Sequence, residues 1–111
     1  MILQIKEVDK ITVAEITDQE ANLYNAEQFK EEIVALIDKG SKTIAVSFEK
    51  VTYVDSSFLG AMVSSLKYAL GKGADICLTD LQKDIYDLLH LIRMDKVFKI
   101  YKTAAEVASG I

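Results

Sequence analysis

The first sixteen residues contain two short hydrophobic runs, from Ile2 to Val8 and from Ile11 to Ile16. Only Asp9 and Lys10 separate the runs, which is too short for the crossover helix that joins parallel strands. Two runs joined by a tight turn are typical of a β-hairpin. We therefore predict that the chain begins with two antiparallel strands.

Two segments have the residue spacing of a capping box, which is typical of the start of a helix. Asn25 and Gln28 form a capping box, in which Asn25 would cap the helix and Gln28 would reach back to it. An apolar stripe follows and predicts a helix from Ala26 to Lys39, closed by Gly40. Thr103-Ala-Ala-Glu106 is a second capping box, so we expect a short terminal helix after it.

Two further apolar stripes with helical spacing lie between these segments. One runs from Leu59 to Leu70 and ends at the glycines of Gly71-Lys-Gly73, and the other runs from Leu81 to Ile92. We interpret each stripe as the buried face of a helix.

Strands are expected between the helices. Large and small residues alternate from Thr43 to Phe48, which is typical of a central strand covered on both faces. Ala74 to Thr79 and Val97 to Tyr101 complete the set. The order β-β-α-β-α-β-α-β-α predicts one α/β domain over residues 1–111, with a mostly parallel sheet and an antiparallel N-terminal hairpin. Since function gathers at the carboxyl ends of such strands, the loop from Tyr53 to Gly60 is the first candidate site.

Charge and composition exclude several classes of protein. The net charge is -4, the wrong sign for a nucleic-acid surface, and the excess lies in residues 1–50, with 6 Lys against 10 Asp and Glu. The longest uncharged run, Ser56 to Leu66, is far shorter than the ~18 apolar residues of a membrane span. The N-terminus has charges where a signal peptide is apolar. We expect a cytoplasmic protein that binds neither nucleic acid nor membrane.

Residues suited to catalysis are scarce. The chain has one Cys and one His, and it lacks a phosphate-binding glycine loop and a nucleophile elbow. We expect His90 on a helix surface and Cys77 in the core. The sequence therefore predicts no enzymatic activity, no cofactor and no metal site.

One polar cluster stands out, Asp55-Ser56-Ser57 before Phe58-Leu59-Gly60, at a junction between a strand and a helix. Either Asp55 or Ser56 could be the helix N-cap. One cap does not account for three consecutive polar residues. A phosphate on Ser56 would also meet free N–H groups at the helix start and add about -1.5 to -2 charges beside Asp55. We interpret the cluster as a phosphorylation switch.

These residues resemble the phosphosite of the STAS-domain anti-sigma factor antagonists of bacteria, whose motif reads Asp-Ser-[Ser/Thr]-Gly-Leu-Gly. The resemblance covers the whole chain in length and element order, so it implies a STAS-like fold. It implies that Ser56 is the phosphoacceptor for a partner that is both an anti-sigma factor and an ATP-dependent serine kinase. Unphosphorylated protein would bind this partner and free the sigma factor, as a monomer or weak dimer.

The chain departs from the family pattern at three positions. Phe58 replaces a Gly, which would place an aromatic at an exposed turn; Asn22 replaces an Asp near the phosphosite; and Arg93 replaces a Gly near the end of the third helix. The partner surface implied by the resemblance contains six residues: Asp55, Ser57, Phe58, Asn22, Leu23 and Tyr24.

Two other hypotheses remain. A receiver-type phosphotransfer domain would use Asp55 as the phosphorylated group and Lys102 as its charge partner, but it also needs an acidic pair after the first strand, where this chain has a hairpin turn. Alternatively, the chain is an unphosphorylated scaffold STAS domain of a larger signalling or transport complex, a reading favoured by an exposed aromatic at Phe58.

Overall fold

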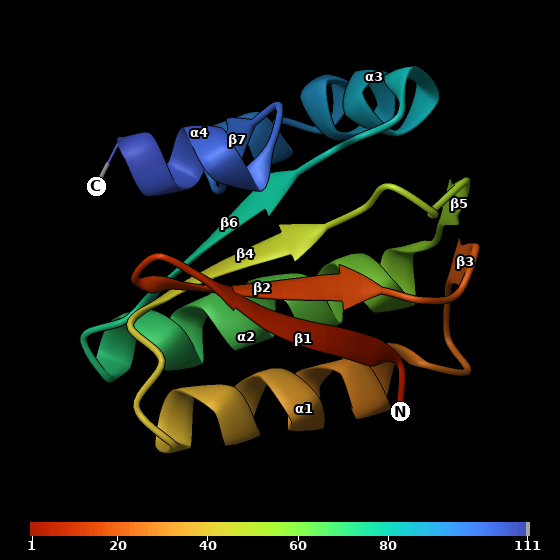
Figure 1. The fold of residues 1–111 in the computed structure, drawn as a ribbon. Helices are drawn as coiled ribbons and strands as arrows, with labels where there is room; N and C mark the ends of the chain where they lie inside the picture. The colour runs from red at the N-terminus through yellow and green to blue at the C-terminus, as the bar shows by residue number, and fades with distance from the viewer. Residues whose placement is uncertain (111) are drawn as a thin grey trace.

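The computed structural model describes residues 1–110 and confirms the N-terminal hairpin (Figure 1). Strand β1 (Leu3–Val8) pairs antiparallel with β2 (Ile11–Ile16), and Val8 lies opposite Ile11. Asp9 makes the turn in the left-handed region at φ 55°, which Asp tolerates better than most residues.

The main sheet has the strand order β1-β2-β4-β6-β7, so β4 (Thr43–Ser47) is central, as predicted. It pairs in parallel with β2 and with β6 (Asp75–Thr79), and β7 (Lys99–Tyr101) pairs in parallel with β6. The last strand is two residues shorter than predicted. The residues before it form a 3₁₀ turn, η1 (Met94–Lys96), whose Met94 carbonyl accepts from the Phe98 N–H.

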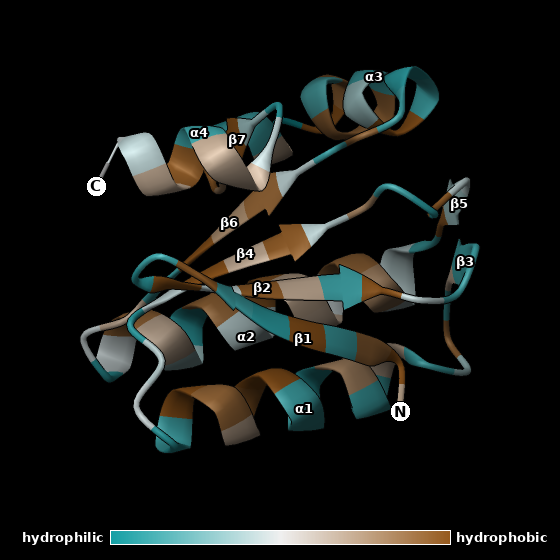
Figure 2. Ribbon diagram, in the orientation of Figure 1, coloured by the Kyte–Doolittle hydropathy of each residue, from teal (hydrophilic) through white to brown (hydrophobic). Residues whose placement is uncertain are grey.

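Helices cover both faces of this sheet unequally. Helices α1 (Ala26–Asp38) and α2 (Ser56–Gly71) pack side by side on one face, and the short α4 (Ala104–Ser109) lies on the other (Figure 1). Hydrophobic residues concentrate on the central strands between these layers (Figure 2). The main core lies under α1 and α2, and a smaller cluster around Val13, Cys77 and Val107 lies under α4. Among residues 1–110, no helix is long and apolar enough to cross a membrane.

Of the two capping boxes predicted from the sequence, one forms and the other does not. Thr103 accepts from the Glu106 N–H (3.2 Å), which confirms that cap, although Glu106 reaches back to the Lys102 N–H (2.7 Å). The capping box at Asn25 is wrong: α1 begins after it, but its side chain makes no cap bond. Its amide instead accepts from the Asn22 N–H (2.9 Å) and donates to the Glu20 carbonyl (2.8 Å).

Glu32, on helix α1, hydrogen-bonds to the start of the chain. Its carboxylate accepts the backbone N–H groups of Ile2 and Leu3, each at 3.0 Å. Hydrogen bonds to a charged acceptor are among the stronger ones in proteins. Glu32 therefore fastens the start of the edge strand β1 to helix α1.

Helix α3 (Lys83–Leu91) buries Ile85 and Leu89 in the main core and leaves His90 exposed, as predicted. His90 Nδ1 lies 2.6 Å from Asp95 Oδ2. This hydrogen bond is the main cause of a lowered pKa of the Asp95 carboxyl. The contact links the end of α3 to η1.

Arg93, between α3 and η1, adopts the left-handed conformation at φ 64°. For a residue with a Cβ this conformation costs roughly 1 kcal/mol or more, whereas glycine adopts it freely. We expect Arg93→Gly to raise the free energy of unfolding by about 0.5–1 kcal/mol, since the added freedom of the unfolded chain offsets part of the gain. Urea titration measures the change. Lys96→Gly, in η1, is the control and should destabilise; equal effects of the two variants would contradict the role of backbone conformation.

Cys77 is 4% exposed, which confirms its place in the core. Burial, together with the nearby charge of Asp75, raises the pKa of the thiol from 9.0 to about 11. Such a shift lowers the thiolate fraction at neutral pH about 100-fold. We expect a disulfide reagent at pH 8 to label the native protein at least 100-fold more slowly than the urea-unfolded protein. Comparable labelling rates would show that the strand is open to solvent.

Candidate partner-binding site

Two very short strands bring the candidate loops together. Strand β3 (Glu20–Ala21) pairs in parallel with β5 (Tyr53–Val54), and the Asp55 N–H donates to the Ala21 carbonyl (3.0 Å). This pair lies beyond the main sheet, at the end where α1 and α2 begin (Figure 1). The loops that lead into the two helices are therefore held side by side.

Asp55 is the N-cap of α2, which decides between the two candidates from the sequence. Its Oδ1 accepts from the Phe58 N–H (2.9 Å), while its Oδ2 accepts from the Leu23 N–H (2.9 Å). One carboxylate thus caps the helix and ties it to the loop before α1. Helix capping is sufficient to explain Asp55, but it does not explain the two serines that follow.

Ser56 and Ser57 are the first two residues of α2, and both are exposed. Across the short sheet, the loop presents Leu23, 64% exposed, and Tyr24, 92% exposed. Tyrosine is among the residues that are enriched in protein interfaces and in their hot spots. The structure therefore brings Asp55, Ser56, Ser57, Leu23 and Tyr24 to one edge of the molecule.

Tyr53 belongs to the same surface and was missed from the sequence. It lies opposite Glu20 in the β3–β5 pair and is 52% exposed. Its place two residues before Asp55 was a signal, because strand residues alternate between buried and exposed faces and the intervening Val54 is apolar.

Asn22 is half-buried and shapes the loop instead of presenting a free side chain. Its amide oxygen accepts from the Tyr24 N–H (3.0 Å), and its amide nitrogen donates to the Glu20 carboxylate (3.3 Å). An aspartate has no donor for the second contact. The amide of Asn22 therefore uses both its oxygen and its nitrogen within the loop.

The prediction that Phe58 is an exposed aromatic on the partner surface is wrong. Phe58 is fully buried, and its ring centroid lies 4.7 Å from that of Phe29 on α1. As the third residue of α2 it points inward, toward the layer between the helices and the sheet. Its contact with Phe29 holds the first turn of α2 against α1.

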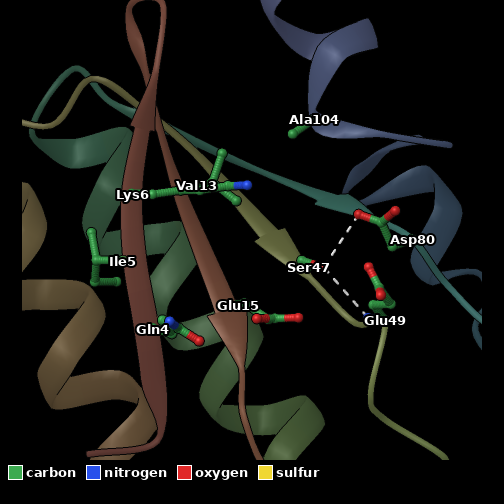
Figure 3. A pocket seen from close by; sticks show the side chains of 9 residues that line it. All are labelled: Gln4, Ile5, Lys6, Val13, Glu15, Ser47, Glu49, Asp80 and Ala104. Atoms are coloured by element: carbon green, nitrogen blue, oxygen red, sulfur yellow. Dashed lines mark hydrogen bonds between the residues drawn. The ribbon is translucent and has the colours of Figure 1, made fainter.

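A cavity of about 330 Å³ lies elsewhere, on the face of the sheet that α4 covers only in part (Figure 3). Ser47 lies at its base and donates to Asp80 (3.2 Å), which also accepts from Thr79 (2.7 Å). None of the residues predicted from the sequence lines this cavity. In the part of the chain described, no group of three or more His, Cys, Asp or Glu residues could hold a metal ion.

Comparison with known protein families gives a match over nearly the whole chain. The family described as the STAS domain matches residues 3–107. The chain belongs to the STAS domain family. The sheet order, the antiparallel hairpin and the helix start at Asp55 are therefore features of a STAS domain.

A relative and two solved structures are similar to this STAS domain over most of its length. A protein of Thermotoga maritima, provisionally named an anti-sigma factor antagonist, is 29% identical over 107 residues, 96% of this chain and 94% of the relative. The crystal structure of a Thermotoga maritima protein provisionally so named aligns with a TM-score of 0.84 at 27% identity, covering 98% of this chain and 93% of that one. The Bacillus cell fate determinant SpoIIAA in its phosphorylated form shares the fold, with a TM-score of 0.69 at 17% identity and 96% of each chain covered.

The two contacts of Asp55 can be tested by substitution. Asp55→Ala removes the helix cap and the tie to Leu23, so we expect the free energy of unfolding to fall by about 1–2 kcal/mol. Amide hydrogen exchange at Leu23 should also become faster. Asp55→Asn keeps an acceptor for the cap and should lose less stability. An unchanged exchange rate at Leu23 in Asp55→Ala would contradict the tie between the loops.

Proposed function

We propose that this STAS domain is an anti-sigma factor antagonist whose binding is switched off by phosphorylation of Ser56. The observation that carries the proposal is the position of Ser56. It is exposed at the N-terminus of α2, beside the carboxylate of Asp55 and on the same edge as Leu23 and Tyr24. The related Thermotoga maritima protein, provisionally named for the same activity, supports this proposal.

In the unphosphorylated state this edge of the molecule exposes apolar side chains, with carboxylates near them in the chain. Leu23, Tyr24 and Tyr53 are exposed, and carboxylates at Asp18, Glu20 and Glu27 are exposed nearby along the chain. Such a surface fits an anti-sigma factor with an apolar pocket and a basic rim. Association should slow as salt rises, because charged rims mainly accelerate encounter.

Phosphorylation changes the charge of this edge. The partner kinase would transfer the γ-phosphoryl group of ATP to Ser56 Oγ, releasing the hydroxyl proton and ADP. Asp55 already accepts from the Phe58 N–H, so the amides of Ser56 and Ser57 are the donors within a phosphate's reach. The dipole at the helix start favours the added charge, whereas an apolar pocket that closes over this edge would have to desolvate two adjacent negative groups, the phosphate and Asp55.

The direct test uses the serine kinase that the source organism pairs with this protein. After incubation with ATP, intact-mass and peptide mass spectrometry should find one phosphate, on Ser56. Ser57→Ala should be modified normally and Ser56→Ala should not. Full modification of Ser56→Ala, or none of the unaltered protein, would falsify the assignment.

The competing hypotheses lose their main support. The scaffold reading rested on an exposed aromatic at Phe58, which is buried. The receiver reading needs Asp55 free to take a phosphoryl group, but both of its carboxylate oxygens accept backbone N–H groups. We propose accordingly that the chain acts by binding and is not itself an enzyme.

A further inference from the structure

A groove of about 550 Å³ lies between α3 and β7 and involves none of the residues of the Ser56 edge. We propose that it binds an acidic, extended peptide segment of a partner protein, with one aromatic or aliphatic side chain of that segment in the groove. The groove is lined by Leu81, Lys83, Tyr86, Ile100, Tyr101 and Lys102.

The floor of the groove is apolar and fixed. Leu81 and Ile100 are partly buried and pack against the main core, and Tyr101 packs against the smaller cluster under α4. Tyr86 forms a wall and is 42% exposed. Backbone bonds hold the two sides, since the Asp80 N–H donates to the Lys102 carbonyl (3.1 Å) and the Tyr86 N–H donates to the Gln82 carbonyl (2.9 Å). Little ordering is needed before a side chain can enter.

The charged residues in the groove lining are basic, whereas carboxylates such as Asp87 and Glu106, which bond to Lys83 and to the Lys102 N–H, lie outside the lining. The lining includes two lysines and no carboxylate. Residues 91–102 include four basic residues and one acidic residue, Asp95, which is already hydrogen-bonded to His90. Lys83 pairs with Asp87 (2.8 Å), but both side chains are mostly exposed, and such a surface pair contributes little to stability. Lys83 can therefore turn to an incoming carboxylate at little cost.

The open edge of the sheet favours a peptide over a compact ligand. Strand β7 is the last strand in the order β1-β2-β4-β6-β7, so its outer edge has no strand partner. An extended segment can use this edge while its side chains occupy the groove, which is a common mode of peptide recognition. The concave lining also suits a side chain better than the flat surface of a bilayer.

Titrations followed by amide NMR shifts of the ¹⁵N-labelled full chain test the proposal. The probe is the peptide acetyl-Glu-Asp-Phe-Asp-Glu-amide at low salt. We expect saturable shifts at Leu81, Tyr86, Ile100 and Tyr101, and none at Leu23 or Tyr24. Versions with Lys in place of the acidic residues, or Ser in place of Phe, should give no saturable shifts. Lys102→Glu should weaken binding at least about tenfold, whereas Lys39→Glu, an exposed lysine at the end of α1, should not.

Three results would overturn the proposal. They are equal shifts with the basic peptide, unchanged affinity in Lys102→Glu that retains its fold by NMR, and binding of 3-phenylpropionate as tight as that of the peptide, which would mark a small-molecule site. Because the probes do not involve Ser56, each of these results leaves the proposed switch untouched.

Discussion

Replacing Phe58 by alanine is expected to lower the free energy of unfolding by about 3–5 kcal/mol, the largest effect on stability that we predict. Phe58 is fully buried, and its ring packs against Phe29, so truncation leaves a cavity between α1 and α2. Aromatic pairs add about 0.5–1.5 kcal/mol to simple burial. Equilibrium unfolding in urea, with fluorescence and circular dichroism as probes, measures the change.

Phe58→Leu is the matched control, because it keeps an apolar side chain and loses only part of the volume. We expect it to cost about half as much as Phe58→Ala or less. Binding should survive in Phe58→Leu, since the residue does not reach the surface. A stable Phe58→Ala protein with weakened binding would instead place Phe58 on the partner interface and contradict the structure.

Phosphorylation of Ser56 is expected to weaken binding to the anti-sigma factor at least about 100-fold, because the interface would have to desolvate a phosphate that also repels the neighbouring carboxylate of Asp55. The phosphate would stand beside Asp55 and close to the anchors Leu23 and Tyr24. Isothermal titration of the protein before and after stoichiometric phosphorylation measures the two dissociation constants.

Three variants separate charge from loss of the side chain. Ser56→Ala should bind about as well as the unaltered protein, because the hydroxyl itself carries little binding energy in this account. Ser56→Glu should bind more weakly, although less so than the phosphorylated protein, because it carries one charge instead of about two. Tyr24→Ala should weaken binding in every state by about 2 kcal/mol, as expected of an interface anchor. Equal affinity of Ser56→Ala and the phosphorylated protein would indicate that the hydroxyl, and not the charge, matters.

Periodic segments of the fold were predictable from the sequence. The alternation of Ile44, Val46 and Phe48 with small residues placed β4 at the centre of the sheet, where it lies. The stripe after Ala26 gave α1 to within one residue of its C-terminal end. These segments bury a regular face, so the spacing of apolar residues follows from the geometry of the element.

The β3–β5 pair could not be predicted in the same way. Each strand has two residues, which is too short for any alternation to be seen. Its stability comes from contacts between distant parts of the chain, such as the bond from the Asp55 N–H to the Ala21 carbonyl. The capping role of Asn25 failed for a local reason, because Asn22 and Glu20 in the preceding loop satisfy its amide.

Phe58 was misplaced although a signal was present. The residues buried along α2 are Phe58, Met62, Ser65, Leu66 and Ala69, which also follow helical spacing. Because the predicted apolar stripe began at Leu59, Phe58 was placed on the exposed face of the helix. The same chain segment was correctly identified as a strand-to-helix junction, and Asp55 as one of two candidate caps.

The central claim is that this chain frees a sigma factor by capturing its anti-sigma factor, under the control of Ser56. The most direct test adds the chain to a preformed complex of fluorescent sigma factor and anti-sigma factor and follows release by anisotropy. The account predicts that unphosphorylated protein and Ser56→Ala release the sigma factor in proportion to their concentration, and that protein phosphorylated on Ser56 does not. Equal release by the phosphorylated and unphosphorylated forms, or release by neither, would contradict it.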